Sequence, residues 1–248
     1  MKSNIERRWK LKERLARVRR PIVRLNAVGG IVLPDILSNL IAGWNFQTFS
    51  AGKFAADFGG TNYDLASGSA SAVAGLIGNA ASYVFFGALP FSPGLNFAGG
   101  VFTGCLWLNT PSMPVGDADI ISNAALSAGY ILRISSAGVV TFFAGNGTGY
   151  DSVVAGSSIA GNTWYFVAFK VDGAGKLWIS LSGTGGYNNF VSANMSGAFV
   201  PTTVSVQYNN TRIVANSLQD TTVFYDRALS DTDLNSIYNN GAGRSLPF

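Results

Sequence analysis

The stretch from Ala160 to Gly183, AGNTWYFVAFKVDGAGKLWISLSG, constrains the fold of this chain more than any other. It predicts two β-strands, over 163–171 and 175–182, joined by a turn at Asp172-Gly173-Ala174-Gly175 in which the glycines can adopt positive φ. Both faces of this hairpin are apolar, one through Val167, Phe169, Val171, Leu177, Ile179 and Leu181 and the other through Trp164, Phe166, Ala168 and Trp178. We therefore expect the hairpin to lie inside an antiparallel sheet that is covered on both sides.

The remaining sequence favours short strands and tight turns over helices. Only 12% of the 248 residues are charged, and 30 are glycine. Strands are expected over 41–47, 62–66, 81–87, 101–109, 118–122, 130–135, 138–144, 203–208 and 219–226, a spacing that is typical of a sandwich or jelly roll. One helix is expected near the end of the chain, capped by Ser230, with Leu234, Ile237 and Tyr238 facing inward, and terminated by Gly241.

Charge is segregated along the chain. Residues 1–24 contain ten Lys or Arg and two Glu, a net charge of +8, whereas residues 25–248 contain seven basic and eleven acidic residues, a net charge of −4. The two parts need separate explanations. We expect a basic docking arm over 1–24, a linker over 25–39 and a β domain over 40–248.

The basic arm has the pattern of an amphipathic helix over residues 3–20, with Ser3 and Glu6 as a capping box. A docking arm for a protein partner, a disordered tail, a nucleic-acid arm and a membrane-surface helix all fit this composition. The residues expected to dock are Arg7, Arg8, Trp9, Lys10, Leu11, Lys12, Arg14, Leu15, Arg17, Val18, Arg19 and Arg20.

Two targeting signals were weighed for this end of the chain. Arg7-Arg8 faintly resembles a twin-arginine export signal, but positive charge continues where the apolar core of a signal should begin. The later apolar stretch, 25–42, is interrupted by Pro34 and Asp35 and is too short to span a bilayer. We therefore expect neither an export signal nor a membrane span.

Six segments, in order, resemble the concanavalin A-like, laminin-G-like jelly roll over roughly residues 40–243. They are an opening strand (40–46), an Asp/Gly/Asn-rich turn (57–62), a Gly-x-x-Gly-x-Ala step (75–80), a strand with a core Trp (102–107), the central hairpin (162–173) and a closing strand and helix (220–238). The family often has His after the position of Trp164, where this chain has Tyr165 and Phe166. The resemblance implies an all-β, antiparallel two-sheet jelly-roll sandwich (concanavalin A-like) with an N-terminal basic helix or arm and a short C-terminal helix.

The sequence argues against an enzyme, although this fold hosts glucanases as well as lectins and structural modules. A glucanase needs two carboxylates, usually Glu, that flank the scissile bond, and no Glu follows Glu13. Asp117 and Asp119 come nearest to such a pair, and they are interpreted as turn and surface residues. The chain has no His, so Ser–His and Cys–His systems are absent, and the single Cys105 is expected in the core. No catalytic residue is expected.

The resemblance also implies a candidate cofactor, Ca²⁺. Related domains often hold this ion between the first loop and the last strand, and Asp57 and Asp220 stand at the matching positions, with carbonyls of the 59–62 turn as further ligands. Alternatively, Asp57 makes an Asx turn and Asp220 satisfies a buried loop. Two acids are a thin ligand set for this ion.

Exposed aromatic rings beside polar loops are the residues from which a glycan site could be built, because ring faces stack on sugar C–H surfaces. The candidates, all near segments rich in Gly or Asn, are Tyr150, Tyr187, Phe190 and Tyr208. The alternative for them is rim packing or a subunit contact. Four tryptophans are expected in the core instead: Trp44, Trp107, Trp164 and Trp178.

Two functional hypotheses follow. The first is a non-enzymatic structural or adhesion protein of a phage virion (capsid decoration, head fibre or tail module), assembled in the host cytoplasm, oligomeric there, and docked to other virion proteins through the arm, with a host-surface glycan as a further partner. The alternative is a carbohydrate-binding lectin module, free or at a cell surface and hence extracellular. Nucleic acid ranks below protein docking because the jelly roll offers no basic face. The sequence favours the first hypothesis.

Overall fold

The computed structural model describes residues 36–59, 63–67, 70–83, 87–88, 93–188, 190–203, 207–208 and 216–246. The predicted docking arm and all of the predicted linker before Ile36 lie outside these residues, so both stay predictions. Among the described residues, no helix has the length and hydropathy that crossing a membrane requires.

The described residues form strands from Leu40 onward, with few helical turns. The strands of one sheet are β1 (Leu40–Trp44), β5 (Ala70–Ala74), β6 (Asn79–Tyr83), β8 (Phe102–Asn109), β13 (Tyr165–Val171), β14 (Lys176–Gly183), β15 (Val191–Asn194) and β17 (Ser217–Tyr225). Those of the other are β2 (Phe49–Ser50), β3 (Lys53–Phe54), β4 (Leu65–Ser67), β7 (Gly87–Ala88), β9 (Ala118–Ser122), β10 (Tyr130–Ile134), β11 (Val139–Gly145), β12 (Tyr150–Ser158) and β16 (Gln207–Tyr208). The helical elements are η2 (Pro93–Asn96), α2 (Asp231–Tyr238) and η3 (Asn239–Gly241).

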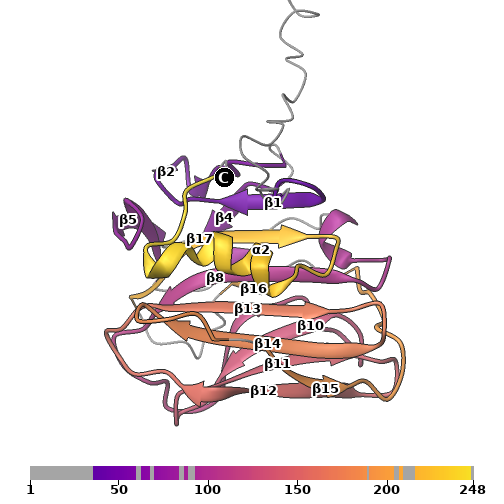
Figure 1. Ribbon diagram of the computed structural model, residues 1–248. Helices are drawn as coiled ribbons and strands as arrows, with labels where there is room; N and C mark the ends of the chain where they lie inside the picture. Colours follow the sequence, from indigo (N-terminus) through magenta and orange to yellow (C-terminus); the bar gives the residue numbers. More distant parts are fainter. Residues whose placement is uncertain are drawn as a thin grey trace, which may run out of the picture. The chain divides into compact units, whose positions relative to one another are not determined.

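These strands build a sandwich of two antiparallel sheets, as Figure 1 shows. Within the described residues, the first sheet has eight strands in the order β15-β14-β13-β8-β17-β6-β5, with β1 also paired to β17. The second has nine, in the order β12-β11-β10-β9-β16-β7-β4-β3-β2. Strands that are distant in sequence are neighbours in both sheets, which is the connectivity of a jelly roll. The predicted all-β sandwich with a short C-terminal helix is confirmed.

The central hairpin forms where it was predicted. Strands β13 and β14 pair in register from Tyr165 opposite Gly183 to Val171 opposite Leu177. The carboxylate of Asp172 organises the turn, because its Oδ1 accepts hydrogen bonds from the amides of Ala174 (2.9 Å) and Lys176 (3.0 Å). Gly175 has φ +73° in this turn, a conformation that favours glycine.

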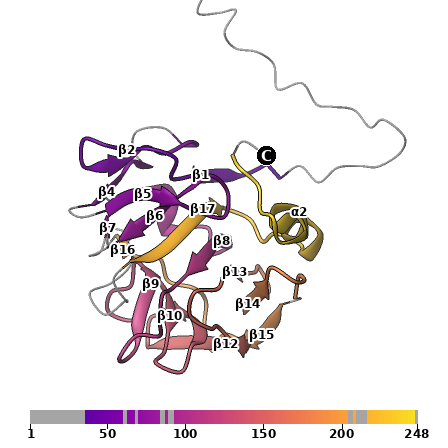
Figure 2. The ribbon, with the colours of Figure 1, turned by 90° about the vertical axis from the view of Figure 1, so that its left-hand side faces the viewer.

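Two hydrophobic clusters explain why this sheet is apolar on both faces. The main core lies between the sheets and includes Phe102, Phe142, Phe169 and Phe224. The second cluster lies between the eight-stranded sheet and α2; its members are Leu40, Cys105, Trp107, Phe166, Ala168, Val223, Tyr225, Leu229, Leu234, Ile237, Tyr238 and Leu246. Figure 2 shows α2 on one side of β8 and β13 and the strands β9, β10 and β12 on the other. The burial predicted for Cys105 is confirmed, and burial raises the pKa of its thiol.

Helix α2 starts as predicted but ends earlier. The side chain of Ser230 accepts a hydrogen bond from the Asp233 amide at 3.1 Å, and the Asp233 carboxylate accepts one from the Ser230 amide at 3.1 Å, which completes a capping box. The predicted end at Gly241 is wrong. The helix ends at Asn239, which adopts a left-handed conformation (φ 50°) and donates its backbone N–H to the carbonyl of Asn235. Asparagine tolerates this conformation better than most residues, so it can terminate a helix in place of glycine.

Two groups of residues differ from the expectation. Strands β2, β3, β5, β12 and β15 were not predicted; β12 is rich in Ser and Gly and buries only Val153 and Ala155, so its alternation is weak. Trp164 and Trp178 are half-buried at the edge of the second cluster, whereas Trp44 and Trp107 are buried as predicted. An indole can remain at a rim when its N–H has a partner, and Trp178 donates its Nε1–H to Asp172 at 2.7 Å.

Candidate functional site

A pocket of about 460 Å³ lies between the loop that follows β14 and the C-terminal half of α2. The loop contributes Thr184, Gly185, Gly186 and Tyr187, and the helical side contributes Asn235, Tyr238 and Asn240. None of these lining residues is charged. We refer to this set of seven residues as the 184–240 pocket.

The loop wall of the pocket is held down on its own strand. Asn188 donates its side-chain N–H to the carbonyl of Leu181 (2.7 Å) and its backbone N–H to the hydroxyl of Ser182 (2.8 Å), and the hydroxyl of Ser180 donates to the Asn188 carbonyl. Ser180 and Ser182 are buried on the face of β14 that points toward the second cluster. These bonds fold the loop back over the sheet and place Tyr187 beside α2.

The helical wall is anchored through Tyr238. Its ring stacks on Trp107 with a centroid distance of 5.6 Å and an interplanar angle of 19°, and its hydroxyl donates to the carbonyl of Gly183 at 2.6 Å. At Gly241, φ is +86°, and an added Cβ would collide with the carbonyl of Thr184. Only a glycine permits this close approach, so Gly241 keeps the end of the helix against the loop.

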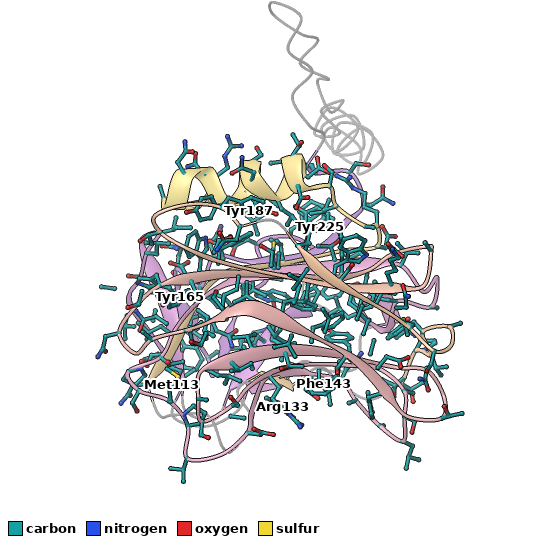
Figure 3. All side chains as sticks on the ribbon, turned by 60° about the horizontal axis from the view of Figure 1, so that its bottom comes forward. Met113, Arg133, Phe143, Tyr165, Tyr187 and Tyr225 are labelled. Carbon is teal, nitrogen blue, oxygen red and sulfur yellow. The ribbon has the colours of Figure 1, made fainter. Side chains whose placement is uncertain are left out.

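Tyr187 connects the two walls of the 184–240 pocket. Its ring centroid lies 5.7 Å from that of Tyr238, and its hydroxyl donates to Asp231 Oδ1 at 3.0 Å. Burial, together with the negative charge of Asp231, raises the pKa of Tyr187. Figure 3 shows Tyr187 next to α2, on the opposite side of the sandwich from Arg133 and Phe143. Of the four predicted aromatic residues, Tyr187 lines this pocket.

Phe190 lies on the same loop but has a different environment. Its ring packs edge-on against Trp178 (centroids 6.2 Å apart, 72°), and Lys170 Nζ lies 4.2 Å from its centroid. Lys170 also donates to the carbonyl of Leu229 at 2.7 Å, and burial lowers its pKa. One face of the Phe190 ring is thus occupied by a cation of the same chain, and a role for Phe190 in glycan binding stays a prediction.

The other two predicted aromatics are not near this loop in the fold. Tyr150 belongs to β12 in the nine-stranded sheet and donates its hydroxyl to the carbonyl of Ala128 at 2.9 Å. Tyr208 belongs to β16, and its side chain lies outside the described residues. Glycan binding by either of them stays a prediction. The structure therefore places Tyr187 and Phe190 on one loop and Tyr150 and Tyr208 in the opposite sheet.

Sequence reasoning missed Thr184, Asn235 and Asn240 as site residues. Thr184 follows the predicted central hairpin and was not selected, and Asn235 was considered only as part of the predicted C-terminal helix. The pair Asn239-Asn240 was a usable signal, because two adjacent asparagines after a helix favour left-handed conformations, and both adopt positive φ here. Their distance from Tyr187 in the sequence hid the contact.

The acids proposed for Ca²⁺ are engaged with backbone amides. Asp57 is exposed, and its Oδ2 accepts the Asn45 N–H at 2.6 Å. Asp220 is buried, its Oδ2 accepts the Ile77 N–H at 2.7 Å and its Oδ1 accepts the Thr221 N–H at 2.8 Å. In the described part of the chain, no three His, Cys, Asp or Glu residues cluster as a metal site would require. Residues 60–62 of the turn that would supply further ligands lie outside the described residues, so the Ca²⁺ site at Asp57 and Asp220 stays a prediction.

Asp117 is exposed, as its interpretation as a surface residue implied, whereas the side chain of Asp119 is largely buried, and both carboxylates pair with Arg133. Asp119 Oδ1 is 2.6 Å from Arg133 Nε, and Asp117 Oδ2 is 4.0 Å from Nη1. The Arg133 guanidinium also lies 5.4 Å from the ring centroid of Phe143. Both carboxylates are therefore engaged in ion pairs with Arg133, a side chain of the neighbouring strand.

Comparison with known proteins identifies the family. A family model described as the concanavalin A-like lectin/glucanases superfamily matches residues 82–235. The chain belongs to the concanavalin A-like superfamily. The matched segment includes Tyr187, Asp231 and Asn235, so much of the 184–240 pocket lies within the concanavalin A-like part of the chain. Superfamily membership confirms the predicted fold, but it leaves the choice between binding and catalysis open.

Solved structures with the same fold have low sequence identity to this concanavalin A-like chain. The binding domain of Paraclostridial mosquitocidal protein 1 has a TM-score of 0.67 at 13% identity over 83% of this chain and 53% of its own. The binding domain of botulinum neurotoxin DC in complex with SialylT has a TM-score of 0.58 at 13% identity, over 82% of this chain and 52% of its own. A Trypanosoma rangeli sialidase has a TM-score of 0.61 at 14% identity, over 97% of this chain and 39% of its own.

Such identities show the fold alone, and this chain spans about half or less of the length of these proteins. No curated protein matches the chain in sequence.

Proposed function

We propose that this chain is a non-catalytic carbohydrate-binding module that takes one end of a saccharide into the 184–240 pocket. The observation that carries this proposal is the uncharged lining of the pocket, which brings Tyr187 together with Asn235 and Asn240. The earlier preference for a virion component gives way to this alternative.

The chemistry of the lining matches that of a sugar. A pyranose presents adjacent hydroxyls, each a donor and an acceptor, and a carboxamide offers one acceptor and two donors to such a pair. Tyr187 and the exposed Asn235 and Asn240 line one cavity, and polar groups make up most of its accessible surface.

The solved structures of similar fold support the same direction. Two of them are binding domains by name, and one of these is in complex with SialylT. The sialidase is an enzyme, but its likeness extends to 39% of its chain and to the fold alone. No similar catalytic set is proposed here, because no Glu follows Glu13 and the chain has no His.

Attachment to a particle through residues 1–24 stays a prediction. It depends on a segment outside the described residues, and the proteins of similar fold named above are toxin binding domains and a sialidase. A domain with a glycan pocket and a basic attachment arm can also serve on a particle, so this prediction and the proposed function are compatible.

Glycan-array binding of the full chain, followed by calorimetry on the best ligand, tests the proposed function. We expect Tyr187→Ala and Asn235→Ala to weaken binding by about tenfold or more, the effect of losing one well-formed contact in a small site. Phe143→Ala is the matched control, because it removes a partly buried aromatic ring from the opposite sheet at a position that was not predicted to bind glycan. Failure to bind any glycan, or equal affinities for the wild type and both pocket variants, would refute the proposal.

A further inference from the structure

The electrostatics of the 184–240 pocket bear on the class of saccharide that it accepts. Its lining residues are Thr, Gly, Tyr and Asn, so the cavity presents no cation to a ligand. One lining residue is hydrogen-bonded to an anion, because the Tyr187 hydroxyl donates to Asp231 Oδ1 at 3.0 Å. The proton of this hydroxyl points to the carboxylate, and the buried Ser180 hydroxyl lies within hydrogen-bonding reach of its oxygen.

Lys170 and Arg227, on the same side of the sandwich, have other partners, and the charge of Lys170 also interacts with that of Asp231. Lys170 Nζ donates to the carbonyl of Leu229 and lies over the Phe190 ring. Arg227 donates to the carbonyl of Ser38 at 3.0 Å and pairs with Asp233 at 3.3 Å. The contact of Lys170 with Leu229 lies just before α2, and that of Arg227 with Asp233 lies in its first turn. The pocket residues Asn235 and Tyr238 belong to the C-terminal half of α2. Arg244, the next cation along the chain, is not among the lining residues.

The helix itself adds to the same field. The C-terminal end of a helix carries a partial negative charge, which disfavours anions within the last turn. Asn235 and Tyr238 lie in the last turn of α2, and Asn240 follows it directly. A ligand carboxylate or sulfate in the pocket would thus face the end of the helix, the Tyr187 oxygen and the charge of Asp231.

We propose that the 184–240 pocket selects uncharged saccharides over their sialylated or sulfated counterparts, and that Asp231, acting through Tyr187, sets this preference. The inference rests on the proposed function and deepens it, since it names the substrate class of the same pocket. Sugar hydroxyls can exchange hydrogen bonds with the side-chain amides of Asn235 and Asn240. An anionic group would lose its hydration in a cavity whose lining offers no cation.

The test compares matched pairs of array glycans that differ only in a terminal sialic acid or a sulfate. The full chain is used throughout, so the ten basic residues of segment 1–24 are the same in every protein. Binding is measured at two salt concentrations, because attraction between the basic segment and anionic glycans is screened by salt. We expect the wild type to bind the uncharged member of a pair more tightly than the charged member, most clearly at the higher salt.

Charge variants then locate the preference. Asp231→Asn should improve affinity for the charged member by about fivefold, the scale of one screened charge pair near a surface, with little change for the uncharged member. Asn235→Lys, at an exposed helix position, removes the carboxamide and should weaken binding of both members, but it should raise the ratio of charged-member to uncharged-member affinity. Thr232→Lys is the control, since it makes the same change in net charge on an exposed residue of α2 outside the pocket lining.

The outcomes separate this inference from the function beneath it. A higher ratio of charged-glycan to uncharged-glycan affinity in Asp231→Asn and Asn235→Lys, but not in Thr232→Lys, supports the inference. Wild-type binding that is equal or tighter for sialylated or sulfated members at high salt overturns the inference and leaves carbohydrate binding intact. Absence of binding to every glycan overturns the proposed function, and the inference falls with it.

Discussion

Asp220 Oδ2 accepts a hydrogen bond from the backbone N–H of Ile77 at 2.7 Å, although 143 residues separate the two. The carboxylate is fully buried, and its Oδ1 accepts the Thr221 N–H at 2.8 Å. A Cβ added at Gly75 would lie 2.7 Å from the same Oδ2. The absence of a side chain at Gly75 therefore lets the turn between β5 and β6 dock on β17 through a buried carboxylate.

The first prediction concerns the pH dependence that Asp220 causes. Burial raises the pKa of Asp220 to about 6, from an ordinary value of 3.8, even though backbone amides stabilise its charged form. Between these two values the native state binds a proton that the unfolded state does not. The contribution of Asp220 to the free energy of unfolding therefore falls as pH rises from about 4 to about 6 and is constant above.

Urea unfolding of the wild type and Asp220→Asn at pH 4, 5, 6 and 7 measures this effect. The variant should lose stability by about 1–3 kcal/mol at pH 4, because the side-chain NH₂ would face a backbone N–H and leave a buried donor without an acceptor. The difference in free energy of unfolding between the wild type and the variant should become smaller as pH approaches 6. A difference that grows with pH over this range would contradict the assignment.

A second prediction concerns the turn of the central hairpin. Asp172 accepts two turn amides through Oδ1 and the Trp178 indole through Oδ2, so Asp172→Ala should reduce the free energy of unfolding by about 2 kcal/mol or more. Asp226→Ala, at an exposed aspartate, is the matched control and should change it by less than about 0.5 kcal/mol. Chemical denaturation of both variants provides the measurement, and equal losses would show that the turn bonds contribute little.

The hydrogen bonds of Asp172 should also make the free energy of unfolding fall at acidic pH. Burial alone would raise the pKa of Asp172, but hydrogen bonds from the Lys176 amide and the Trp178 indole outweigh it, and the pKa is lowered from 3.8. The stability that these bonds provide is therefore present above the unfolded-state value and is lost as pH falls below it. The loss in Asp172→Ala should accordingly be smaller at pH 2 than at pH 7, as measured by denaturation at both values.

A third prediction concerns the close contact that shapes the pocket. Gly241→Ala forces a side chain into a left-handed conformation and against the Thr184 carbonyl, so we expect a loss of about 2 kcal/mol or more together with weaker glycan binding. Gly185→Ala, where an added Cβ meets no atom within 4 Å, is the control for stability. Thermal unfolding compares the two variants, and similar melting temperatures would rule out a tight contact at Gly241.

A fourth prediction addresses the division of labour between the arm and the β domain. Removal of residues 1–24 takes away a net charge of +8 and should leave a folded protein whose affinity for an uncharged glycan is unchanged. Circular dichroism and calorimetry measure these two properties. If the truncated chain loses its β-sheet signal, the arm is part of the folding unit and the predicted boundary is misplaced.

Local signals explain which parts of the fold were predictable. The hairpin was found because alternating residues from Val167 to Leu181 flank a turn that Asp172 and glycines mark. The start of α2 was found because Ser230 and Asp233 form a cap within four residues. Strand β12 was missed because only Val153 and Ala155 are buried in it, so its alternation is weak. It forms as a strand through its pairing with β11, which local sequence does not indicate.

The candidate site was predicted only in part. Tyr187 was selected because it is an aromatic residue after a Gly-rich turn, and the pocket contains it. Its partners Asp231, Asn235 and Asn240 follow more than 40 residues later, and nothing local relates a helix position to a loop position across such a distance. Phe190 matched the same rule, yet its ring is packed by Lys170 and Trp178.

The sequence by itself determined the antiparallel sandwich and the second apolar face that α2 covers, because these follow from residue types and their alternation. Only the tertiary structure decided which polar residues meet. The folding back of Asn188 onto β14 and the glycine contact at Gly241 bring Tyr187 to α2, and from there Asp231 gives the pocket its electrostatic character. Such contacts depend on packing between distant segments, which a one-dimensional pattern does not encode.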